Sequence, residues 1–503
     1  MIPDELASMF LTKVQLQKLK ILSKMQYEKV DLLSLQNEID GSKRQVKDII
    51  KDINEDIEGD VSIEITEGII KFNKKIEHSE YIEIVNNCRI LYVVSSSFFQ
   101  LMLFVLEKRS FSIVQAAQNL SYSESYVYKL VNKLRGFFKQ LDAGFQLDKK
   151  NETTIQLVGC ESTIRLFHYL SVSTATKGNH WAFNTINEEE ILNIQKYLNS
   201  DRYERLSPIG KNKANFILAV YESAFKNKRK ISLVDKDIIN LGETINKEKE
   251  ITLLLNYLKE ERMGTNRKLH SELIHLAFFA NHFIEELRIK KEKIIIGEKI
   301  YRLKRNNIVK SCVKILDNIL EKISIESDVY YLLLYNLCNR VVVINHLCLY
   351  KFMPLYNVPP LGTDLEYFVE NCVKSGLSDY RNNPSFSKLK YNLTQVIIGY
   401  LVLIVPTPKK IFVEFFHRPA YKSIIENAIE HNYNNDALQI TDDYSEADVI
   451  ISDTGGYENK QYFYFKDVFD QNSWYELGFY LNQIISKQIT ENNYLDSLNH
   501  TIR

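Results

Sequence analysis

The segments SKRQVKDIIKDIN (residues 42–54) and SESYVYKLVNKLR (residues 123–135) share one pattern. Each begins with serine, carries an apolar residue four places later, and continues with apolar residues three, four and seven places after that one. Apolar residues at this spacing lie on one face of an α-helix, and a serine just before a helix is a favoured N-cap. The pattern therefore predicts two helices, the second running to about Leu141. Their predicted buried faces are Val46, Ile49, Ile50 and Ile53 in the first, and Val127, Leu130, Val131, Leu134, Phe138 and Leu141 in the second.

A shorter helix and a turn precede each of these predicted helices. Before the second copy, an apolar face runs from Ile113 to Leu120 and includes two small alanines, and SYS (residues 121–123) ends it. Before the first copy, an apolar face lies between residues 32 and 39, and Asp-Gly (residues 40–41) makes the turn. Two helices joined by so short a turn cross steeply. Both copies therefore predict a helix-turn-helix.

The outer faces of the two predicted second helices differ in charge. From Glu124 to Leu141 there are four basic residues and one acid, in a chain whose 64 Lys and Arg balance its 64 Asp and Glu. From Ser42 to Asn54 four basic residues meet two acids, and three more acids follow by Glu58. A basic helix suits the major groove, with its first polar residues at base edges and its later Lys and Arg at phosphates. We therefore expect the second helix to be the stronger DNA-binding element. The candidate contact residues are Lys43, Arg44, Gln45 and Lys47 in the first copy, and Ser125, Tyr126, Tyr128, Lys129, Lys133 and Arg135 in the second.

Each helix-turn-helix is followed by alternating apolar and polar residues around a turn: VSIEITEGIIKFNKK (residues 61–75) and FQLDKKNETTIQLVG (residues 145–159). Such alternation predicts a two-stranded hairpin, and a hairpin in this place is a wing. The alternative is two short amphipathic helices of an ordinary helical protein. Because helix and wing recur together, the sequence favours two winged helix-turn-helix domains and double-stranded DNA as the partner.

The composition indicates several globular domains. The chain has 503 residues, of which 45% are hydrophobic and 25% charged, and this length exceeds what one core usually contains. Six cysteines are scattered without a C-x-x-C pair, which favours a reduced, cytoplasmic protein and argues against structural zinc. No signal peptide is expected. ILYVVSSSFFQLMLFVL (residues 90–106) contains three serines and a glutamine, so we interpret it as a buried helix, and no membrane contact is expected.

Residues 187–406 are predicted to form one helix after another, because apolar residues recur with a helical period. The predicted helices include EEEILNIQKYLN (residues 188–199), EITLLLNYLKEE (residues 250–261) and LHSELIHLAFFANHFIEELR (residues 269–288). A break near residues 290–307 divides the region into two bundles. It contains no nucleotide-binding loop or nucleophile motif, so we expect neither a cofactor nor an enzyme.

Histidine is the residue type in these bundles that is suited to act as a switch, because its charge can change close to neutral pH. His270, His275 and His282 share one predicted helix, and His346 lies on the corresponding helix of the second bundle. Glu272, three residues before His275, is expected to orient its ring. The alternative for each histidine is a packing role in a helix contact, and no metal site is predicted.

Residues 407–503 change character, because continuous apolar strands such as ADVIISD (residues 447–453) and QYFYFK (residues 461–466) alternate with helices. This pattern predicts a small, mostly parallel α/β domain. DTGGYE (residues 453–458) follows a strand but lacks the P-loop lysine and the Rossmann glycine spacing, so we interpret it as a turn.

Two winged helices, two helical bundles and an α/β module follow one another in the Mga/AtxA family of transcriptional regulators, which the chain resembles over essentially its whole length. SKRQVKDIIKDIN is similar to the motif S-x-R-x-V-x-x-D-I-x-x-[IL]-N of that family and of related sugar-responsive activators. The resemblance implies a cytoplasmic virulence regulator whose bundles, called PRDs, are phosphorylated on histidine by phosphocarrier proteins of the sugar phosphotransferase system. It also implies a homodimer that forms through a C-terminal module similar to the EIIB component of that system. The implied domains are winged helix-turn-helix domains at residues 1–80 and 81–175, PRD-like domains at residues 185–298 and 299–406, and an EIIB-like domain at residues 407–503.

Two departures from the family pattern bear on the expected chemistry. An active EIIB component has a cysteine at the end of its first strand, whereas FVEFFHRPAYK (residues 412–422) has His417 there and no cysteine. The module is therefore expected to be an inactive scaffold. Asn336 stands where related domains often have histidine. The candidate phosphoacceptors are His275 first, then His282 and His346.

Two other functions share parts of this organisation. A phosphotransferase enzyme that passes phosphate from histidine to a sugar is disfavoured by the missing cysteine and by the two winged helices. An RNA-binding antiterminator has similar bundles but begins with a small all-β domain, whereas this chain begins with helices.

Overall fold

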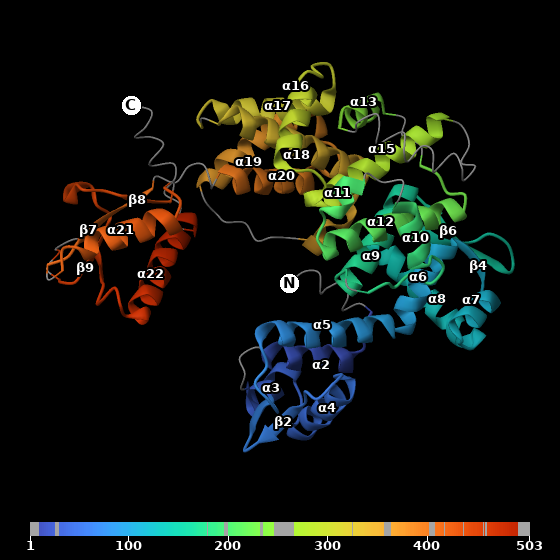
Figure 1. The fold of residues 1–503 in the computed structure, drawn as a ribbon. Coiled ribbons are helices and arrows are strands. Elements are labelled where there is room, and N and C mark those ends of the chain that lie inside the picture. Colours follow the sequence, from blue (N-terminus) through green and yellow to red (C-terminus); the bar gives the residue numbers. More distant parts are fainter. Residues whose placement is uncertain are drawn as a thin grey trace. The chain divides into compact units, whose positions relative to one another are not determined.

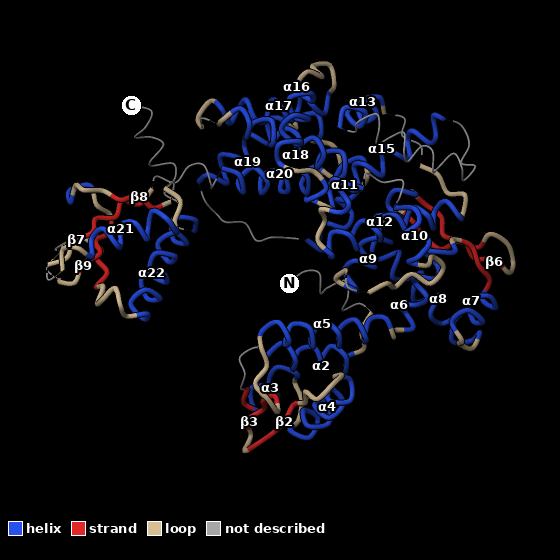
Figure 2. The backbone as a smooth tube through the Cα atoms, in the orientation of Figure 1, coloured by secondary structure: helices blue, strands red, loops and turns tan. Residues whose placement is uncertain are grey.

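The computed structural model of the chain is mainly helical, as predicted, and Figure 2 shows small sheets between the helices. It divides into two compact units, Met1–Ile308 with Cys338–Val358, and Val309–Leu337 with Pro359–Arg503. Figure 1 labels the helices and strands along the chain. The described residues are 10–25, 30–178, 180–195, 200–231, 235–245, 266–323, 325–356, 364–401, 408–416, 418–435, 437–455, 457 and 460–490. The helix predicted at residues 250–261, His417, and parts of the predicted turn at residues 453–458 lie outside them.

The first helix-turn-helix begins and ends where its capping residues stand. The Asp31 carboxylate accepts hydrogen bonds from the amides of Leu33 and Ser34 at 2.9 and 3.3 Å, and Asp40 ends the first helix in the left-handed conformation, at φ 49°. The second helix starts at the predicted N-cap Ser42. A hairpin follows, and a short strand before the first helix joins it in an antiparallel sheet of order β1-β3-β2. The elements are β1 (Val30–Asp31), α3 (Leu32–Ile39), α4 (Lys43–Asp56), β2 (Ile63–Thr66) and β3 (Ile69–Phe72).

The predicted apolar face of α4 forms the core of this first domain. Val46, Ile49, Ile50 and Ile53 are all buried, and each aliphatic side chain of this size stabilises the fold by roughly 1.5–3 kcal/mol relative to exposure. Residues of α2 (Lys13–Lys24) and α5 (His78–Val94) complete the same cluster. The core therefore fixes which face of α4 is left for solvent.

The second helix-turn-helix repeats this order of elements, with a longer second helix. Its sheet has the order β4-β6-β5, so a third strand again precedes the first helix. The predicted face of the second helix is buried except for Leu141, which is half-buried at the helix end. Neither third strand was predicted, because two or three residues are too few to show alternation. The elements are α6 (Ser97–Lys108), β4 (Ser110–Ser112), α7 (Ile113–Leu120), α8 (Glu124–Leu141), β5 (Phe145–Lys149), β6 (Thr154–Gly159) and α9 (Glu161–Thr176).

Residues 90–106 form parts of two helices, so the prediction of one buried helix was wrong. α5 ends at Val94, and Ser96 caps α6 by accepting a hydrogen bond from the Phe99 amide at 3.4 Å. Among the described residues, no single helix is long and apolar enough to cross a membrane. α5 and α6 meet that test only as a pair, and they bend by 69° where they join.

The remainder of the first unit is also helical. The segment predicted as a break at residues 290–307 contains helix α16 (Lys290–Tyr301). Its buried face includes Ile296, Ile300 and Lys293, and the lysine weakens the apolar period by which a helix is recognised. The other elements are α10 (Glu188–Gln195), α11 (Ser200–Glu204), α12 (Pro208–Lys226), α13 (Lys236–Ile245), α15 (Asn266–Phe283), η2 (Glu285–Leu287), the π-helical η3 (Val342–His346) and η4 (Leu349–Tyr356).

The helices that belong largely to the second unit carry the predicted apolar stripes. Gly376 allows α17 and α19 to approach closely, because a Cβ atom added there would lie 2.3 Å from the Ile315 side chain. The helices are α17 (Asn307–Leu320), α18 (Ser327–Val341), α19 (Asp364–Gly376), η5 (Ser378–Tyr380) and α20 (Phe386–Leu401).

The C-terminal residues of the second unit form an α/β fold. All pairings in its sheet, of order β10-β9-β7-β8, are parallel, and β9 is buried along its whole length. The predicted alternation of strands and helices is therefore present. The elements are β7 (Lys409–Glu414), α21 (Tyr421–Asn432), β8 (Leu438–Ile440), η6 (Tyr444–Glu446), β9 (Val449–Ser452), β10 (Gln461–Tyr464) and α22 (Gln471–Thr490).

Candidate nucleic-acid interfaces and a buried histidine network

The start and orientation of α8 follow from local capping and from its apolar face. Ser121 ends α7 in the left-handed conformation, at φ 58°. The Ser123 hydroxyl then accepts a hydrogen bond from the Tyr126 amide at 3.3 Å and caps α8. Val127 and Leu134 are completely buried. The opposite face of α8 is therefore held toward solvent.

The predicted contact residues of α8 all lie on this outer face, where five are exposed and Arg135 is half-buried. Tyr128, 60% exposed, is the most open of the tyrosines on this helix. Three candidates also have partners within the protein, which the sequence did not indicate. The Tyr126 hydroxyl lies 2.7 Å from that of Ser97, the Lys133 ammonium lies 4.4 Å from the centre of the Phe98 ring, and Arg135 donates to the Leu147 carbonyl at 3.3 Å.

The hairpin β5–β6 is fixed to α8 through that bond from Arg135 to Leu147. At the hairpin tip the Asn151 side chain accepts hydrogen bonds from the amides of Thr153 and Thr154, at 3.1 and 2.7 Å. Lys149 and Lys150 are exposed beside this turn. These lysines were not predicted as contact residues. Two adjacent lysines at the tip of a predicted wing could have indicated a phosphate contact.

The candidates on α4 are exposed, but two of them interact with neighbours on the same helix. The Gln45 side chain accepts a hydrogen bond from the Ser42 amide at 3.0 Å, which completes a capping box. Arg44 lies 3.9 Å from Asp48 in an exposed i,i+4 pair, and such pairs contribute little to stability. Lys43 and Lys47 complete the set. Exposed acids therefore lie beside the basic residues of this helix and partly offset their charge, as the charge count predicted.

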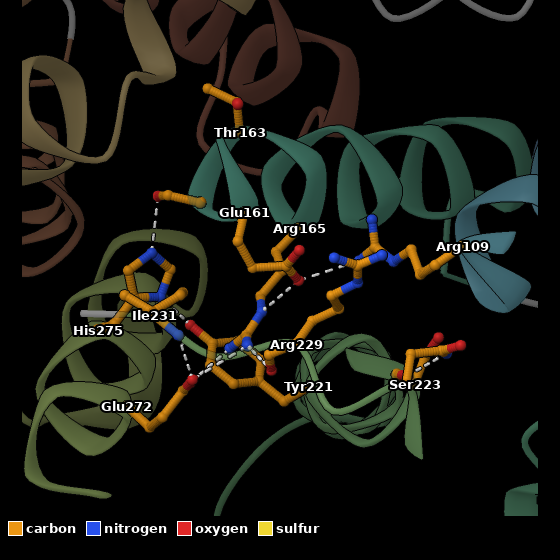
Figure 3. A network of polar contacts seen from close by, with 12 residues as sticks. Arg109, Glu161, Thr163, Arg165, Tyr221, Ser223, Arg229, Ile231, Glu272 and His275 are labelled. Atoms are coloured by element: carbon orange, nitrogen blue, oxygen red, sulfur yellow. Dashed lines mark hydrogen bonds and ion pairs between the residues drawn. The ribbon is translucent and has the colours of Figure 1, made fainter. Parts of the chain in front are cut away.

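His275, the first phosphoacceptor candidate, is completely buried where α9, α12 and α15 meet (Figure 3). Its Nε2 atom lies 2.8 Å from the Ser162 hydroxyl, and its Nδ1 atom contacts the Tyr221 hydroxyl. Burial holds the pKa of His275 well below its usual value, and the positive charge of Arg165 lowers it further. The ring is therefore neutral, and both of its nitrogens are engaged.

Glu272 does not orient His275, contrary to the prediction. Its carboxylate accepts hydrogen bonds from Arg165 at 2.6 and 3.2 Å, and also from the Ile231 amide. Arg165 extends from α9 toward this carboxylate (Figure 3) and lies 4.6 Å from the centre of the Tyr221 ring. A buried ion pair thus connects α9, the first helix after the second hairpin, to the helix that carries His275.

A second carboxylate extends this network toward α6. Glu161 accepts hydrogen bonds from Arg165 at 3.1 Å and from Arg109 at 3.2 Å. Arg109 is 1% exposed, and burial lowers its pKa to about 10, although Glu161 opposes this shift. Two arginines and two carboxylates therefore balance one another beside His275.

The other histidine candidates lie apart from this network. His282 is half-buried, and burial lowers its pKa to about 3, with a further contribution from Arg340. His346 is half-buried in η3, where burial lowers its pKa against the opposing charges of Asp235 and Asp237. His270 lies 2.8 Å from the Glu243 carboxylate.

Asn336 is buried on α18, and its amide donates to the Tyr400 hydroxyl at 3.0 Å. This bond joins α18 to α20.

Exposed aromatic side chains gather on one face of the C-terminal α/β fold. Tyr475 and Phe479 of α22 are each 68% exposed. With Phe463 and Tyr480 they line one open pocket, which Glu476 and Gln483 border. Side chains of this kind are enriched at the centres of protein interfaces.

Comparison with known proteins gives one match. Residues 84–171 match the family described as the Mga helix-turn-helix domain, a span that runs from within α5 to within α9 and contains the second helix-turn-helix and its hairpin. A search of curated proteins found no matching relative.

Proposed function

We propose that this chain, a DNA-binding transcriptional regulator of the Mga family, holds promoter DNA with α8 as its recognition helix. The observation that carries the proposal is the outer face of α8, which lies within the matched residues 84–171. It is exposed, and from Glu124 to Leu141 it carries four basic residues and one acid. A helix of this kind, presented after a tight turn, is the element that enters the major groove in helix-turn-helix proteins.

The residues of α8 divide by position. Ser125 and Tyr128 lie in its first turns and are exposed, which suits contact with base edges. Lys129 and Lys133 follow on the same face and suit phosphates, because a flexible ammonium group binds phosphate as a point charge. Arg135 contributes chiefly by positioning the hairpin. Lys149 and Lys150 of that hairpin would reach a neighbouring phosphate.

The first helix-turn-helix is proposed as a second, weaker DNA-binding domain. Lys43, Arg44 and Lys47 are exposed, but Asp48 and Asp52 are exposed on the same helix and repel phosphate. We therefore expect α4 to add affinity mainly by extending the contact along the duplex. Once one of two linked domains is bound, the other is held near the DNA at a high effective concentration.

The regulatory part of the proposal concerns phosphorylation of histidine by phosphotransferase-system phosphocarriers, with the helical bundles acting as PRD-like domains. A phosphoryl group adds about two negative charges. Both ring nitrogens of His275 have hydroxyl partners, so phosphorylation there would require α15 to separate from Ser162 of α9. Since α9 closes the matched domain, this separation would reach the DNA-binding part of the chain. His282 and His346 are the second candidates.

Homodimerisation through the C-terminal fold is the remaining part of the proposal, with this fold as an inactive EIIB-like scaffold. The exposed aromatic face at Tyr475 and Phe479 supports it, because a solvated aromatic cluster is costly in water and is stabilised by burial against a second copy. Dimerisation would bring two DNA-binding parts onto one promoter.

A salt-titrated gel shift tests the DNA-binding proposal. The full chain is mixed with labelled duplexes from its own genome in competition with a random duplex at several salt concentrations. We expect tighter binding to a subset of genomic duplexes and a strong decrease of affinity with salt, because phosphate contacts release counterions. Equal, salt-insensitive binding to every duplex, or no binding at low salt, would refute it.

A further inference from the structure

Two cysteines lie on chain segments that pack together where β6 is followed by α9. Cys160 stands directly before α9 and is exposed, and Cys348 follows η3 and is half-buried. Two contacts place their chain segments together: the Ser162 hydroxyl donates to the Leu347 carbonyl at 3.3 Å, and the rings of Phe167 and Phe352 lie 5.9 Å apart. The residues that flank the cysteines are therefore packed against each other.

The hydrogen bonds of the Cys348 sulfur go to the Asn345 and His346 carbonyls, both at 4.0 Å. The neighbouring Cys348 thiol lowers the pKa of Cys160 to about 5. Cys160 and burial raise the pKa of Cys348. The position of Cys160 at a helix N-terminus also favours a thiolate. One member of the pair is therefore a nucleophile at neutral pH, and the other retains the proton.

The remaining four cysteines differ in their surroundings. Cys88, Cys312, Cys338 and Cys372 are buried, and burial raises the pKa of Cys88 and of Cys372 to about 11. Buried protonated thiols react slowly with oxidants. The backbone at Cys348 is also unusual, because its φ of 64° lies in the left-handed region that favours glycine.

We propose that Cys160 and Cys348 are a peroxide-sensitive thiol pair that closes to a reversible disulfide. In the first step the Cys160 thiolate attacks one oxygen of hydrogen peroxide, the O–O bond breaks, and Cys160 becomes a sulfenic acid. The released hydroxide takes up a proton and leaves as water. In the second step the Cys348 sulfur attacks the Cys160 sulfur, the S–O bond breaks, and the hydroxyl leaves as water with the Cys348 proton. Two thiols and one peroxide thus give one disulfide and two waters.

The bond would fasten the start of α9 to the segment that follows η3. Ser162, which contacts both His275 and the Leu347 carbonyl, lies two residues after Cys160. A disulfide that closes so long a loop stabilises the folded state by restricting the unfolded chain. Oxidation is therefore expected to hold this corner of the protein in its present arrangement, whether or not any histidine is phosphorylated.

Peptide mapping of the full chain tests the proposal. The reduced, desalted protein is treated with equimolar hydrogen peroxide, free thiols are blocked with iodoacetamide, and the digest is analysed by mass spectrometry. We expect one cross-linked peptide pair that contains Cys160 and Cys348, has lost two hydrogens and separates on reduction. We also expect a higher melting temperature for the oxidised protein. Alkylated Cys348 together with overoxidised Cys160, or oxidation spread equally over the six cysteines, would overturn the proposal.

Three variants sharpen the result. Cys348→Ser should leave Cys160 as a sulfenic acid that dimedone traps, whereas Cys160→Ser should abolish rapid peroxide consumption. The control, Cys372→Ser, should still form the cross-link at the wild-type rate. A cross-link that persists between other cysteines in Cys160→Ser would contradict the assignment of Cys160 as the attacking group.

Discussion

Replacing Glu272 with glutamine tests whether the buried network holds α9 to α15. The Arg165 and Glu272 side chains are 0% and 1% exposed, and their nearest atoms are 2.6 Å apart. Glutamine keeps the shape of glutamate but carries no charge. Arg165 and Arg109 would then share the single carboxylate of Glu161, which leaves one positive charge uncompensated inside the protein.

Removing one partner of a buried ion pair typically costs about 3–5 kcal/mol. Since roughly 1.4 kcal/mol corresponds to a factor of ten in an equilibrium constant, the unfolding constant should rise by at least about a hundredfold. Urea unfolding followed by tryptophan fluorescence measures it. The chain has two tryptophans, and Trp474→Phe leaves Trp181, which lies 5.8 Å from Phe216 on α12, as the reporter of this region.

The matched control is Glu190→Gln, which removes a carboxylate from the pair with Lys226. That pair has the same 2.6 Å separation, but its side chains are 43% and 42% exposed, so we expect a change below about 1 kcal/mol. If Glu272→Gln costs no more than this control, the network does not stabilise the contact between α9 and α15.

Three further predictions concern acid stability, the histidine switch and the dimer. Burial holds the pKa of His275 well below 6.5 and lowers that of His282 to about 3. The unfolded chain therefore binds more protons below pH 6.5, and the free energy of unfolding should fall as the pH is lowered from there, by up to about 1.4 kcal/mol per pH unit for each histidine. His282→Gln should reduce that slope in urea titrations between pH 7 and pH 5, and an unchanged slope would contradict the prediction. His275→Asp should increase amide hydrogen exchange in α9 and shift promoter output in the direction opposite to His275→Ala; identical behaviour of two folded variants would leave His275 as a packing residue and favour His346. Removal of residues 407–503, or Phe479→Ser with Tyr475→Ser, should convert the proposed dimer to monomer in light scattering, and a truncated chain that stays fully dimeric would refute this interface.

Local signals were sufficient to predict the second helices of both helix-turn-helix units. Ser42 and Ser123 mark the first turns of α4 and α8, and the apolar residues behind them are the ones that the structure buries. Caps and periodicity act within a few residues of the chain, so a single sequence records them. The junction of α5 and α6 had a signal of the same kind, because Ser95 and Ser96 interrupt the apolar run and Ser96 caps the second helix.

Contacts between distant segments could not be predicted in this way. The partners of His275 are Ser162 and Tyr221, which lie 113 and 54 residues away. Lys133 on Phe98 is a similar case, because the ring belongs to a different helix. Such pairs depend on how whole helices pack, and periodicity within each helix contains no information about its neighbour. For the same reason Glu272 could be placed on the helix of His275 but not assigned to Arg165.

The salt dependence of DNA affinity tests the central claim, that α8 is the recognition helix, most directly. The slope of log affinity against log salt concentration is measured for the wild type, for Lys129→Ala with Lys133→Ala, and for Lys43→Ala with Arg44→Ala. Each lost phosphate contact should make the slope shallower by about 0.9. We predict that the α8 variant binds every duplex more weakly and has the shallower slope, while the α4 variant changes less. A larger effect of the α4 variant, or a wild-type slope in the α8 variant, would contradict the account.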